Sequence, residues 1–256
     1  MNANNISDGS ILTRNDNGIG IIEFAHPKGN SLPGKLLDKL AVQIQLFGEN
    51  PDCKALLIRS QGNGPFCAGA SFDELLNLKS QEQSEVFFSG FAKVMSAMIS
   101  CPKFIVCRVQ GKAIGGGVGL IAASDYVLAH KDSSIKLSEL SIGFGPFIIG
   151  PIVERKLGRA NFQNLTIDSE WRDSSWCCER GLFSTLHESI EELDRATSAI
   201  LKELSERNIE AMRSLKKIFW EDSSTLSNLI FTRVKETAKL ALSPFVREKV
   251  QALVKK

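Results

Sequence analysis

The chain has 256 residues, of which 43% are hydrophobic and 23% are charged, and its formal net charge at pH 7 is +2. The length is enough for a full core and fits one domain, with room for an appended helical segment. So small a net charge gives no reason to expect a nucleic-acid-binding protein, and no apolar run is long enough to span a membrane. Residues 1–8 are polar and lack a secretory apolar core, so we expect a cytosolic protein.

The first half of the chain alternates predicted strands and helices. Residues 11–12 and 20–24 flank an Asn-Gly turn within 15–18, which predicts a hairpin. The elements that follow are a helix over 32–47, a strand over 55–60, a helix over 84–99 that ends at Cys101-Pro102, a strand over 104–109, a helix over 118–124 and strands over 126–129 and 135–137. This alternation predicts a largely parallel sheet with functional residues at the carboxyl ends of its strands.

The second half is predicted to be helical from about residue 149. Its amphipathic segments cover 188–204, 208–220, 225–242 and 243–254, with shorter ones over 161–171 and 173–180. No linker rich in Pro, Gly or Ser separates them from the first half. Helices this amphipathic must pack on the core or on another subunit.

The cysteines form no CxxC pair, and no histidine stands at metal-binding spacing from any of them. The sequence therefore favours buried, reduced thiols over a metal site. Cys67 lies in a turn, but nothing nearby in sequence supplies a base, so we interpret it as a packing residue and not as a nucleophile.

Two glycine-containing turns follow two of the predicted strands. Residues 110–120 follow the strand over 104–109 and lead into a helix, while residues 64–72 follow the strand over 55–60. A turn of this kind is often only a connection, but it also points free backbone N–H groups at one spot. Two such turns, each offering one N–H, can hold a single oxygen atom and so form an oxyanion hole.

At these residues the chain resembles the crotonase (enoyl-CoA hydratase/isomerase) superfamily. The resemblance is carried by Phe66-Cys67-Ala68-Gly69-Ala70, Gly111-Lys112-Ala113-Ile114-Gly115-Gly116-Gly117 and Ser124-Asp125, and residues 27–32 and 138–143 also fit. It extends from about Ile11 to at least Gly181. The chain looks like bacterial proteins called enoyl-CoA hydratase/isomerase or methylglutaconyl-CoA hydratase.

The resemblance implies an α/β fold, a spiral of ββα units with a helical C-terminal trimerisation region. On this basis we expect residues 1–190 to form the acyl-CoA-binding core. Residues 191–256 would pack on that core or on a neighbouring subunit, in a homotrimer or a dimer of trimers.

The same resemblance implies that an acyl-CoA thioester places its carbonyl oxygen between the backbone N–H groups of Ala70 and Gly116, which stabilise an enolate. Small residues suit these positions because the substrate must reach the main chain. Ala68 and Lys28 are the implied contacts to CoA, although Lys28 can equally be a solvated lysine. CoA is then part of the substrate, and no separate cofactor or metal is expected.

Hydratases of the superfamily carry two glutamates, and here only one position keeps its acid. The position three residues after the middle glycine of the loop is Gly119, which leaves Glu139 as the acid/base. Glutamates are usually solvated, but the apolar segment over 142–150 predicts a wall that raises the pKa of Glu139. Asp73 and Glu74 follow the other turn and could supply a second group, although we favour helix capping for both.

Several functions remain open on the sequence alone. A single carboxylate suits the proton shuttle of enoyl-CoA isomerisation, whereas hydration normally needs a second group. Decarboxylation of a carboxyacyl-CoA needs only the oxyanion hole and an apolar pocket. The non-enzymatic alternative is a subunit that binds CoA thioesters without catalysing a reaction.

Overall fold

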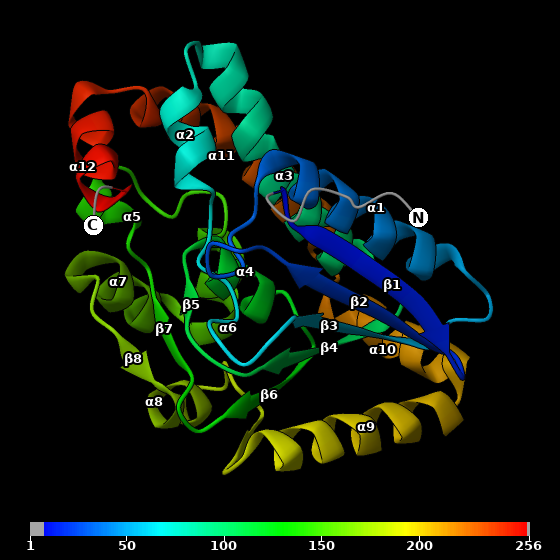
Figure 1. Ribbon diagram of the computed structural model, residues 1–256. Helices are drawn as coiled ribbons and strands as arrows, with labels where there is room; N and C mark the ends of the chain where they lie inside the picture. The colour runs from blue at the N-terminus through cyan, green and yellow to red at the C-terminus, as the bar shows by residue number, and fades with distance from the viewer. Residues whose placement is uncertain (1–7, 255–256) are drawn as a thin grey trace.

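The computed structural model describes residues 8–254, and its centre is a six-stranded sheet (Figure 1). The strand order is β1-β2-β3-β4-β6-β9. The strands are β1 (Ser10–Asp16), β2 (Ile19–Ala25), β3 (Ala55–Ser60), β4 (Phe104–Val109), β6 (Tyr126–His130) and β9 (Thr185–His187). Only β1 and β2 pair antiparallel, as a hairpin at the edge, and the remaining pairs are parallel. The predicted largely parallel sheet is therefore confirmed.

A smaller sheet lies beside the first. It consists of β5 (Ala113–Ile114), β7 (Ser134–Lys136) and β8 (Arg172–Asp173), with β7 in the middle. The pairing of β5 with β7 places the end of the 110–120 turn next to the segment that leads to Glu139.

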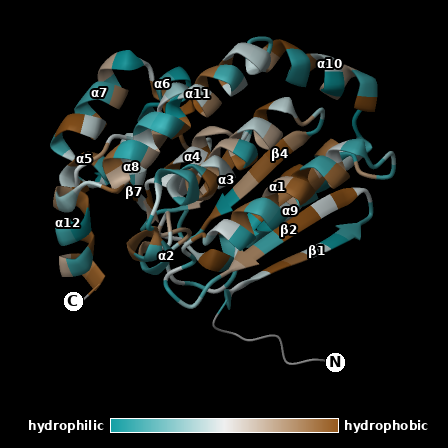
Figure 2. Cartoon of the chain, turned by 90° about the horizontal axis from the view of Figure 1, so that it is seen from above, coloured by the Kyte–Doolittle hydropathy of each residue, from teal (hydrophilic) through white to brown (hydrophobic). Residues whose placement is uncertain are grey.

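Helices cover both faces of the large sheet. In chain order they are α1 (Gly34–Glu49), α2 (Phe72–Asn77), α3 (Gln81–Ser100), α4 (Gly116–Ala122), α5 (Glu139–Ile142), α6 (Gly150–Leu157), α7 (Arg159–Asp168), α8 (Ser174–Glu179), α9 (Ile190–Glu206), α10 (Ile209–Phe219), α11 (Ser223–Ala241) and α12 (Pro244–Val254). The main core lies between the sheet and α1, α3 and α4, and it includes Ile22, Phe24 and Leu40. Hydrophobic residues concentrate along β2 and β4 (Figure 2).

The opposite face of the sheet is covered by α9. Leu193 and Leu201 of this helix pack with sheet residues such as Leu57 and Val106 in a second, smaller cluster. Further along the chain, α11 packs along α3. The helices after residue 190 therefore lie against the rest of the same chain.

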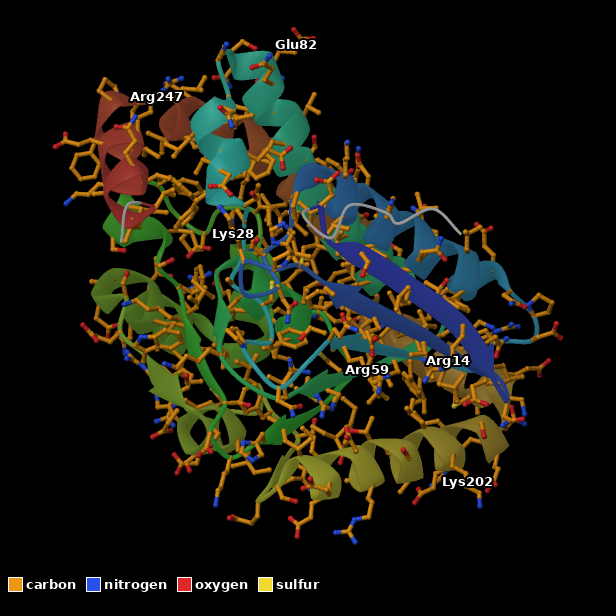
Figure 3. The ribbon with its side chains drawn as sticks, in the orientation of Figure 1. Arg14, Lys28, Arg59, Glu82, Lys202 and Arg247 are labelled. Atoms are coloured by element: carbon orange, nitrogen blue, oxygen red, sulfur yellow. The ribbon has the colours of Figure 1, made fainter. Side chains whose placement is uncertain are left out.

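The last described helix, α12, lies against α2 and α5. Val246 and Val250 are buried, and the Arg247 guanidinium donates a hydrogen bond to the Leu78 carbonyl oxygen at 2.8 Å (Figure 3). A Cβ on Gly143, which ends α5, would lie only 2.5 Å from the Phe245 ring. The turn that begins at Glu139 is thus packed directly under α12.

The Ser124-Asp125 motif joins the end of α4 to the C-terminal half. The buried carboxylate of Asp125 accepts hydrogen bonds from the Ile105 N–H, the Lys216 ammonium group and the Trp220 indole N–H, at 2.7, 2.7 and 2.9 Å. A buried charge with this many partners is well compensated. It fixes α10 against the strand and helix that frame the 110–120 turn.

Most predicted elements are confirmed, with shifted ends. The strands β3 and β4 have the predicted bounds, but α4 begins at Gly116 and not at residue 118, and α1 begins at Gly34 because Pro33 is its N-cap. β9 and α6 were not predicted as separate elements, since three residues are too short for a periodicity and α6 carries glycine and proline in its first turn.

Two expectations concern the thiols and the membrane. Five of the six cysteines are buried as expected, but Cys178 is only half-buried. Between residues 8 and 254 no helix has the length and apolar character needed to cross a membrane. Of the polar N-terminal residues 1–8, residues 1–7 lie outside the described part of the chain.

Candidate active site

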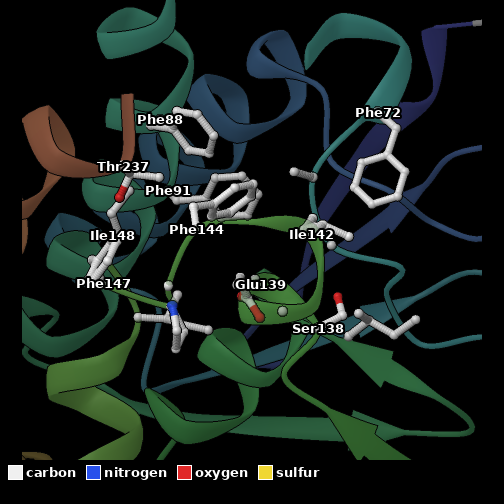
Figure 4. A pocket seen from close by; sticks show the side chains of 18 of the residues that line it. Phe72, Phe88, Phe91, Ser138, Glu139, Ile142, Phe144, Phe147, Ile148 and Thr237 are labelled. Carbon is white, nitrogen blue, oxygen red and sulfur yellow. The ribbon is translucent and has the colours of Figure 1, made fainter. Parts of the chain in front are cut away.

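A cavity lies at the carboxyl ends of the strands, where the two sheets meet the helices (Figure 4). Its volume is about 60 Å³. The lining residues are Ala68, Gly69, Ala70, Phe72, Phe88, Phe91, Ile114, Gly115, Gly116, Ser138, Glu139, Ile142, Phe144, Gly145, Pro146, Phe147, Ile148, Ile149 and Thr237. The sequence-predicted residues Ala68, Ala70, Gly116 and Glu139 therefore meet in one place, whereas Lys28 does not line the cavity.

The turn at Ala70 points the Ala70 backbone N–H away from Leu32, the residue that is hydrogen-bonded to the turn. The Gly69 carbonyl oxygen accepts a hydrogen bond from the Leu32 N–H at 2.8 Å. Because C=O and N–H point in opposite directions across a trans peptide, the N–H of Ala70 points away from Leu32. Gly69 has φ +83°, a left-handed conformation that favours glycine, and this allows the chain to turn at that point.

The turn at Gly116 directs its N–H in the same manner from a helix terminus. The Gly115 carbonyl oxygen accepts hydrogen bonds from the N–H groups of Val118 and Gly119, at 2.8 and 3.2 Å. The N–H of Gly116, across the same peptide, therefore points out of the beginning of α4. A Cβ on Gly69 would lie 3.7 Å from the Gly116 nitrogen, so the two turns are in contact.

Glycine at 116 is also required for space. A Cβ at this position would lie 2.1 Å from the Phe91 ring, closer than any real contact. A small residue at this position gives the substrate access to the main chain, and the packing of Phe91 is a second reason for glycine.

Glu139 stands at the beginning of α5 with its carboxylate against the Gly115 turn. A Cβ on Gly115 would lie 2.9 Å from Oε1, so only glycine leaves room for the carboxylate. Oε2 is buried and has no hydrogen-bond partner among residues 8–254. Burial raises the pKa of Glu139 from 4.5 to about 7, against the opposing effect of the Glu139 and Ser138 backbone N–H groups. The predicted apolar wall is present, since Ile142, Phe144 and Ile149 line the same cavity.

The position of Gly119 is filled by a hydrophobic side chain. A Cβ there would lie 2.6 Å from Ile149 Cγ2 and 3.2 Å from Met95 Sδ. No second carboxylate lines the cavity in the described part of the chain, and Ile149 occupies the space that a longer residue at 119 would need.

Asp73 and Glu74 lie in the first turn of α2 and are engaged outside the cavity. Glu74 Oε2 accepts a hydrogen bond from the Gly34 N–H at 2.8 Å, which places the carboxylate at the beginning of α1. Asp73 forms an exposed ion pair with Lys28 (Figure 3). Neither acid lines the cavity, so the structure gives no support to a second catalytic group from Asp73 or Glu74. Both lie in the first turn of α2, where acids were expected to cap the helix, and Glu74 also caps the beginning of α1.

Cys67 is a packing residue, as expected. It is fully buried, and burial raises the pKa of its thiol to about 12. Its carbonyl oxygen accepts a hydrogen bond from the Ile114 N–H at 2.9 Å, which joins the two turns. A protonated thiol in this environment is not a nucleophile.

The aromatic part of the cavity was not anticipated. Phe88 and Phe91 come from α3, Phe144 and Phe147 from the segment after α5, and Thr237 from α11 (Figure 4). Phe144 and Phe147 belong to the apolar segment noted in the sequence, but helical spacing alone assigns Phe88 and Phe91 to the core. Nothing in the sequence around Thr237 indicates that this residue reaches the site.

Comparison with known proteins identifies the family. A family model described as Enoyl-CoA hydratase/isomerase matches residues 14–252. The chain belongs to this family. A probable enoyl-CoA hydratase of Bacillus subtilis is 23% identical over 243 residues, which cover 94% of each chain.

Other relatives carry hydrolase names. A (7aS)-7a-methyl-1,5-dioxo-2,3,5,6,7,7a-hexahydro-1H-indene-carboxyl-CoA hydrolase of Mycobacterium tuberculosis is 24% identical over 78% of this chain and 79% of its own. Among solved structures, an enoyl-CoA hydratase from Bacillus halodurans superposes with a TM-score of 0.86 at 19% identity, covering 94% of this chain and 99% of its own. The fold is therefore that of the enoyl-CoA hydratases, as the sequence motifs implied.

Proposed function

We propose that this protein isomerises the double bond of an enoyl-CoA thioester, with Glu139 as the only acid/base. The observation that carries the proposal is the single carboxylate in the cavity. Glu139 lines it without a hydrogen-bond partner for Oε2 in the described chain, and Ile149 fills the space at Gly119. One carboxylate in the cavity that both turns line suits a reaction in which the same group removes and returns a proton.

The mechanism follows from the two turns and the carboxylate. The thioester carbonyl oxygen of a 3-enoyl-CoA accepts hydrogen bonds from the N–H groups of Ala70 and Gly116. Glu139 removes a proton from C2, and the electrons form a dienolate whose charge rests on that oxygen. The now neutral Glu139 returns the proton to C4, the double bond moves to C2–C3, and the carboxylate is regenerated.

The raised pKa of Glu139 suits both halves of this cycle. A carboxyl group with a pKa of about 7 is a stronger base than a solvated glutamate, and it still holds the proton long enough to return it. The apolar lining that causes the shift also keeps bulk water from the dienolate.

Two alternatives are less compatible with the cavity. Hydration or thioester hydrolysis needs a group that activates water as well as the oxyanion hole, and Glu139 is the only carboxylate lining the cavity between residues 8 and 254. A carboxyacyl-CoA would bring its own carboxylate next to Glu139, and no Lys, Arg or His lines the cavity in that part of the chain. Decarboxylation and the methylglutaconyl substrate are disfavoured for this reason.

A panel of substrates tests the proposal. A 3-enoyl-CoA, crotonyl-CoA and 3-methylglutaconyl-CoA are each incubated with the protein in deuterium oxide, and products are identified by mass spectrometry. Conversion of the 3-enoyl-CoA to the 2-enoyl-CoA is expected, and because Glu139 returns the proton that it removed from C2, most of the product should carry no solvent deuterium at C4. Hydration of crotonyl-CoA without isomerisation, or release of free CoA, contradicts the proposal, and no turnover of any of the three thioesters favours a non-catalytic binding subunit.

For assembly, we propose a homotrimer or a dimer of trimers. The support is an exposed apolar surface on α10 and α11 that includes Leu215, Ile218, Phe219, Leu229 and Phe231. A protein rarely leaves so many large apolar side chains in water. Light scattering coupled to size-exclusion chromatography measures the mass of the particle, and a monomer of 28.1 kDa would contradict the proposal.

A further inference from the structure

An aromatic wall closes the cavity on the side formed by α3 and the segment after α5. The rings of Phe88 and Phe144 meet edge to face with their centroids 5.9 Å apart. Both side chains are more than nine-tenths buried and line the cavity. Phe88 also packs edge to face against Phe87, at 5.1 Å, so its ring is held from both sides.

The cavity is small for an acyl chain. An apolar cavity of about 150 Å³ holds one benzene ring, and this cavity has a volume of about 60 Å³. By the same scale it holds roughly two to three carbon atoms. A thioester whose carbonyl oxygen lies at the two turns can therefore place only a few further carbons before it reaches the phenylalanine rings.

The same wall is also uncharged. No Lys, Arg or His lines the cavity in the described part of the chain, and the Thr237 hydroxyl is occupied by a hydrogen bond to the Arg233 carbonyl oxygen at 3.1 Å. A carboxylate or phosphate at the far end of an acyl chain would be buried without a partner, which is costly. The cavity therefore selects an apolar chain end.

We propose that the substrate is a short, uncharged enoyl thioester of about four to six carbon atoms, and that Phe88 and Phe144 set this limit. The inference rests on the proposed function for the thioester and the oxyanion hole. It adds the class of acyl group and two specificity-determining residues that do not touch the reacting atoms.

Binding of saturated acyl-CoAs tests the limit without any chemistry. Affinities of butyryl-, hexanoyl-, octanoyl- and decanoyl-CoA are measured by isothermal titration calorimetry against CoA alone. In an open apolar site each further methylene contributes about fourfold in affinity. We expect this gain to stop by hexanoyl-CoA and decanoyl-CoA to bind at least tenfold more weakly than butyryl-CoA.

Removal of either ring should open the cavity. Phe144→Ala and Phe88→Ala are expected to raise the affinity for decanoyl-CoA at least tenfold, with less than a threefold change for butyryl-CoA. Since a buried Phe→Ala substitution can prevent folding, the milder Phe144→Leu and Phe88→Leu are made in parallel and should shift the limit in the same direction. Phe183→Leu is the matched control, because Phe183 is equally buried but does not line the cavity.

The outcomes separate this inference from the proposed function. If the wild-type protein binds decanoyl-CoA as tightly as butyryl-CoA, or if Phe183→Leu moves the limit as far as Phe88→Leu, the inference is overturned. A clear length limit in binding without isomerisation of but-3-enoyl-CoA supports it and rejects only the proposed reaction. Failure to bind any acyl-CoA rejects both.

Discussion

Two acid-bearing regions of this molecule look alike in sequence and differ in the structure. Glu74 and Glu139 each follow a small-residue turn or strand end, and each lies in the first turn of a short helix. Glu74 accepts a hydrogen bond from a backbone N–H of α1, whereas Glu139 Oε2 has no partner in the part of the chain that the structure describes. The carboxylate that we propose as the acid/base is thus the one whose Oε2 is buried without a hydrogen-bond partner among the described residues.

The largest expected effect concerns these two residues directly. Glu139→Gln keeps the shape of the side chain but cannot accept the substrate proton, so isomerase activity should fall by about 10²- to 10⁴-fold. Steady-state kinetics with but-3-enoyl-CoA measure the loss, and CoA affinity should be unchanged. Glu74→Gln is the matched control and should retain at least a third of the activity; equal losses in both variants would remove the distinction between the two regions.

The oxyanion hole gives the next largest effect. Ala70→Pro removes the backbone N–H that we propose as one of the two oxyanion donors. Loss of one such donor typically costs about 10²- to 10³-fold in kcat. Circular dichroism confirms folding before the assay. A folded Ala70→Pro protein with unchanged turnover would show that the thioester oxygen does not lie at Ala70.

The pH dependence of the free energy of unfolding depends on the same buried carboxyl group of Glu139. Burial raises the pKa of Glu139 to about 7, so between pH 4.5 and 7 the folded state holds a proton that the unfolded state releases. The stability that this group contributes is full below pH 4.5 and is lost as the pH rises through 7. The glutamine of Glu139→Gln carries no charge. At pH 8 the free energy of unfolding of this variant should therefore be higher than that of the wild type by up to about 3 kcal/mol. Urea unfolding at pH 5 and pH 8 measures both proteins, and the same difference at the two pH values would contradict the assignment.

A second carboxylate can be introduced into the cavity at position 119, where the hydratases of the family carry a glutamate. Gly119→Glu would place a Cβ 2.6 Å from Ile149 Cγ2, and overpacking of this kind typically costs about 1–3 kcal/mol. Gly119→Glu combined with Ile149→Ala should recover part of that loss and gain hydration of crotonyl-CoA, which is followed spectrophotometrically. If the protein with Gly119→Glu alone has the same midpoint of thermal unfolding as the wild type, the expected overpacking is wrong.

The smallest effect is expected at Lys28. Its exposed ion pair with Asp73 shows that it can be satisfied without CoA, and exposed pairs contribute little. If Lys28 contacts a CoA phosphate, Lys28→Ala should weaken CoA binding less than about fivefold at low salt, with no difference at high salt. Titration calorimetry at two salt concentrations tests this, and an unchanged affinity at low salt excludes the contact.

The sequence predicted the elements that have strong local patterns. Strands β3 and β4 are short runs of apolar residues, and the two turns that follow them carry glycines at positions where only glycine fits. The motifs predicted that Ala70, Gly116 and Glu139 share one site, and the three residues line the same cavity. The strands and turns follow from patterns within a few residues, whereas the meeting of these three residues was implied by the family resemblance.

The rest could not be predicted because it depends on contacts between distant segments. Glu74 is 40 residues from Gly34, whose N–H it accepts, so its engagement in α1 is invisible to a local pattern. Ile149 fills the space at Gly119 only after α4 and α6 are packed together. Thr237 reaches the cavity because α11 lies along α3, which amphipathic spacing does not specify.

The packing of α12 over α5 has a consequence for synthesis of the protein. Phe245 contacts the turn that begins at Glu139, about 100 residues earlier in the chain. At translation rates of about 5–20 residues per second, a nascent chain that already contains Ala70, Gly116 and Glu139 waits roughly 5–20 s for the helix that covers this turn. During that interval the apolar side chains beneath α12 face water on the ribosome, and a chaperone has its best opportunity to bind there.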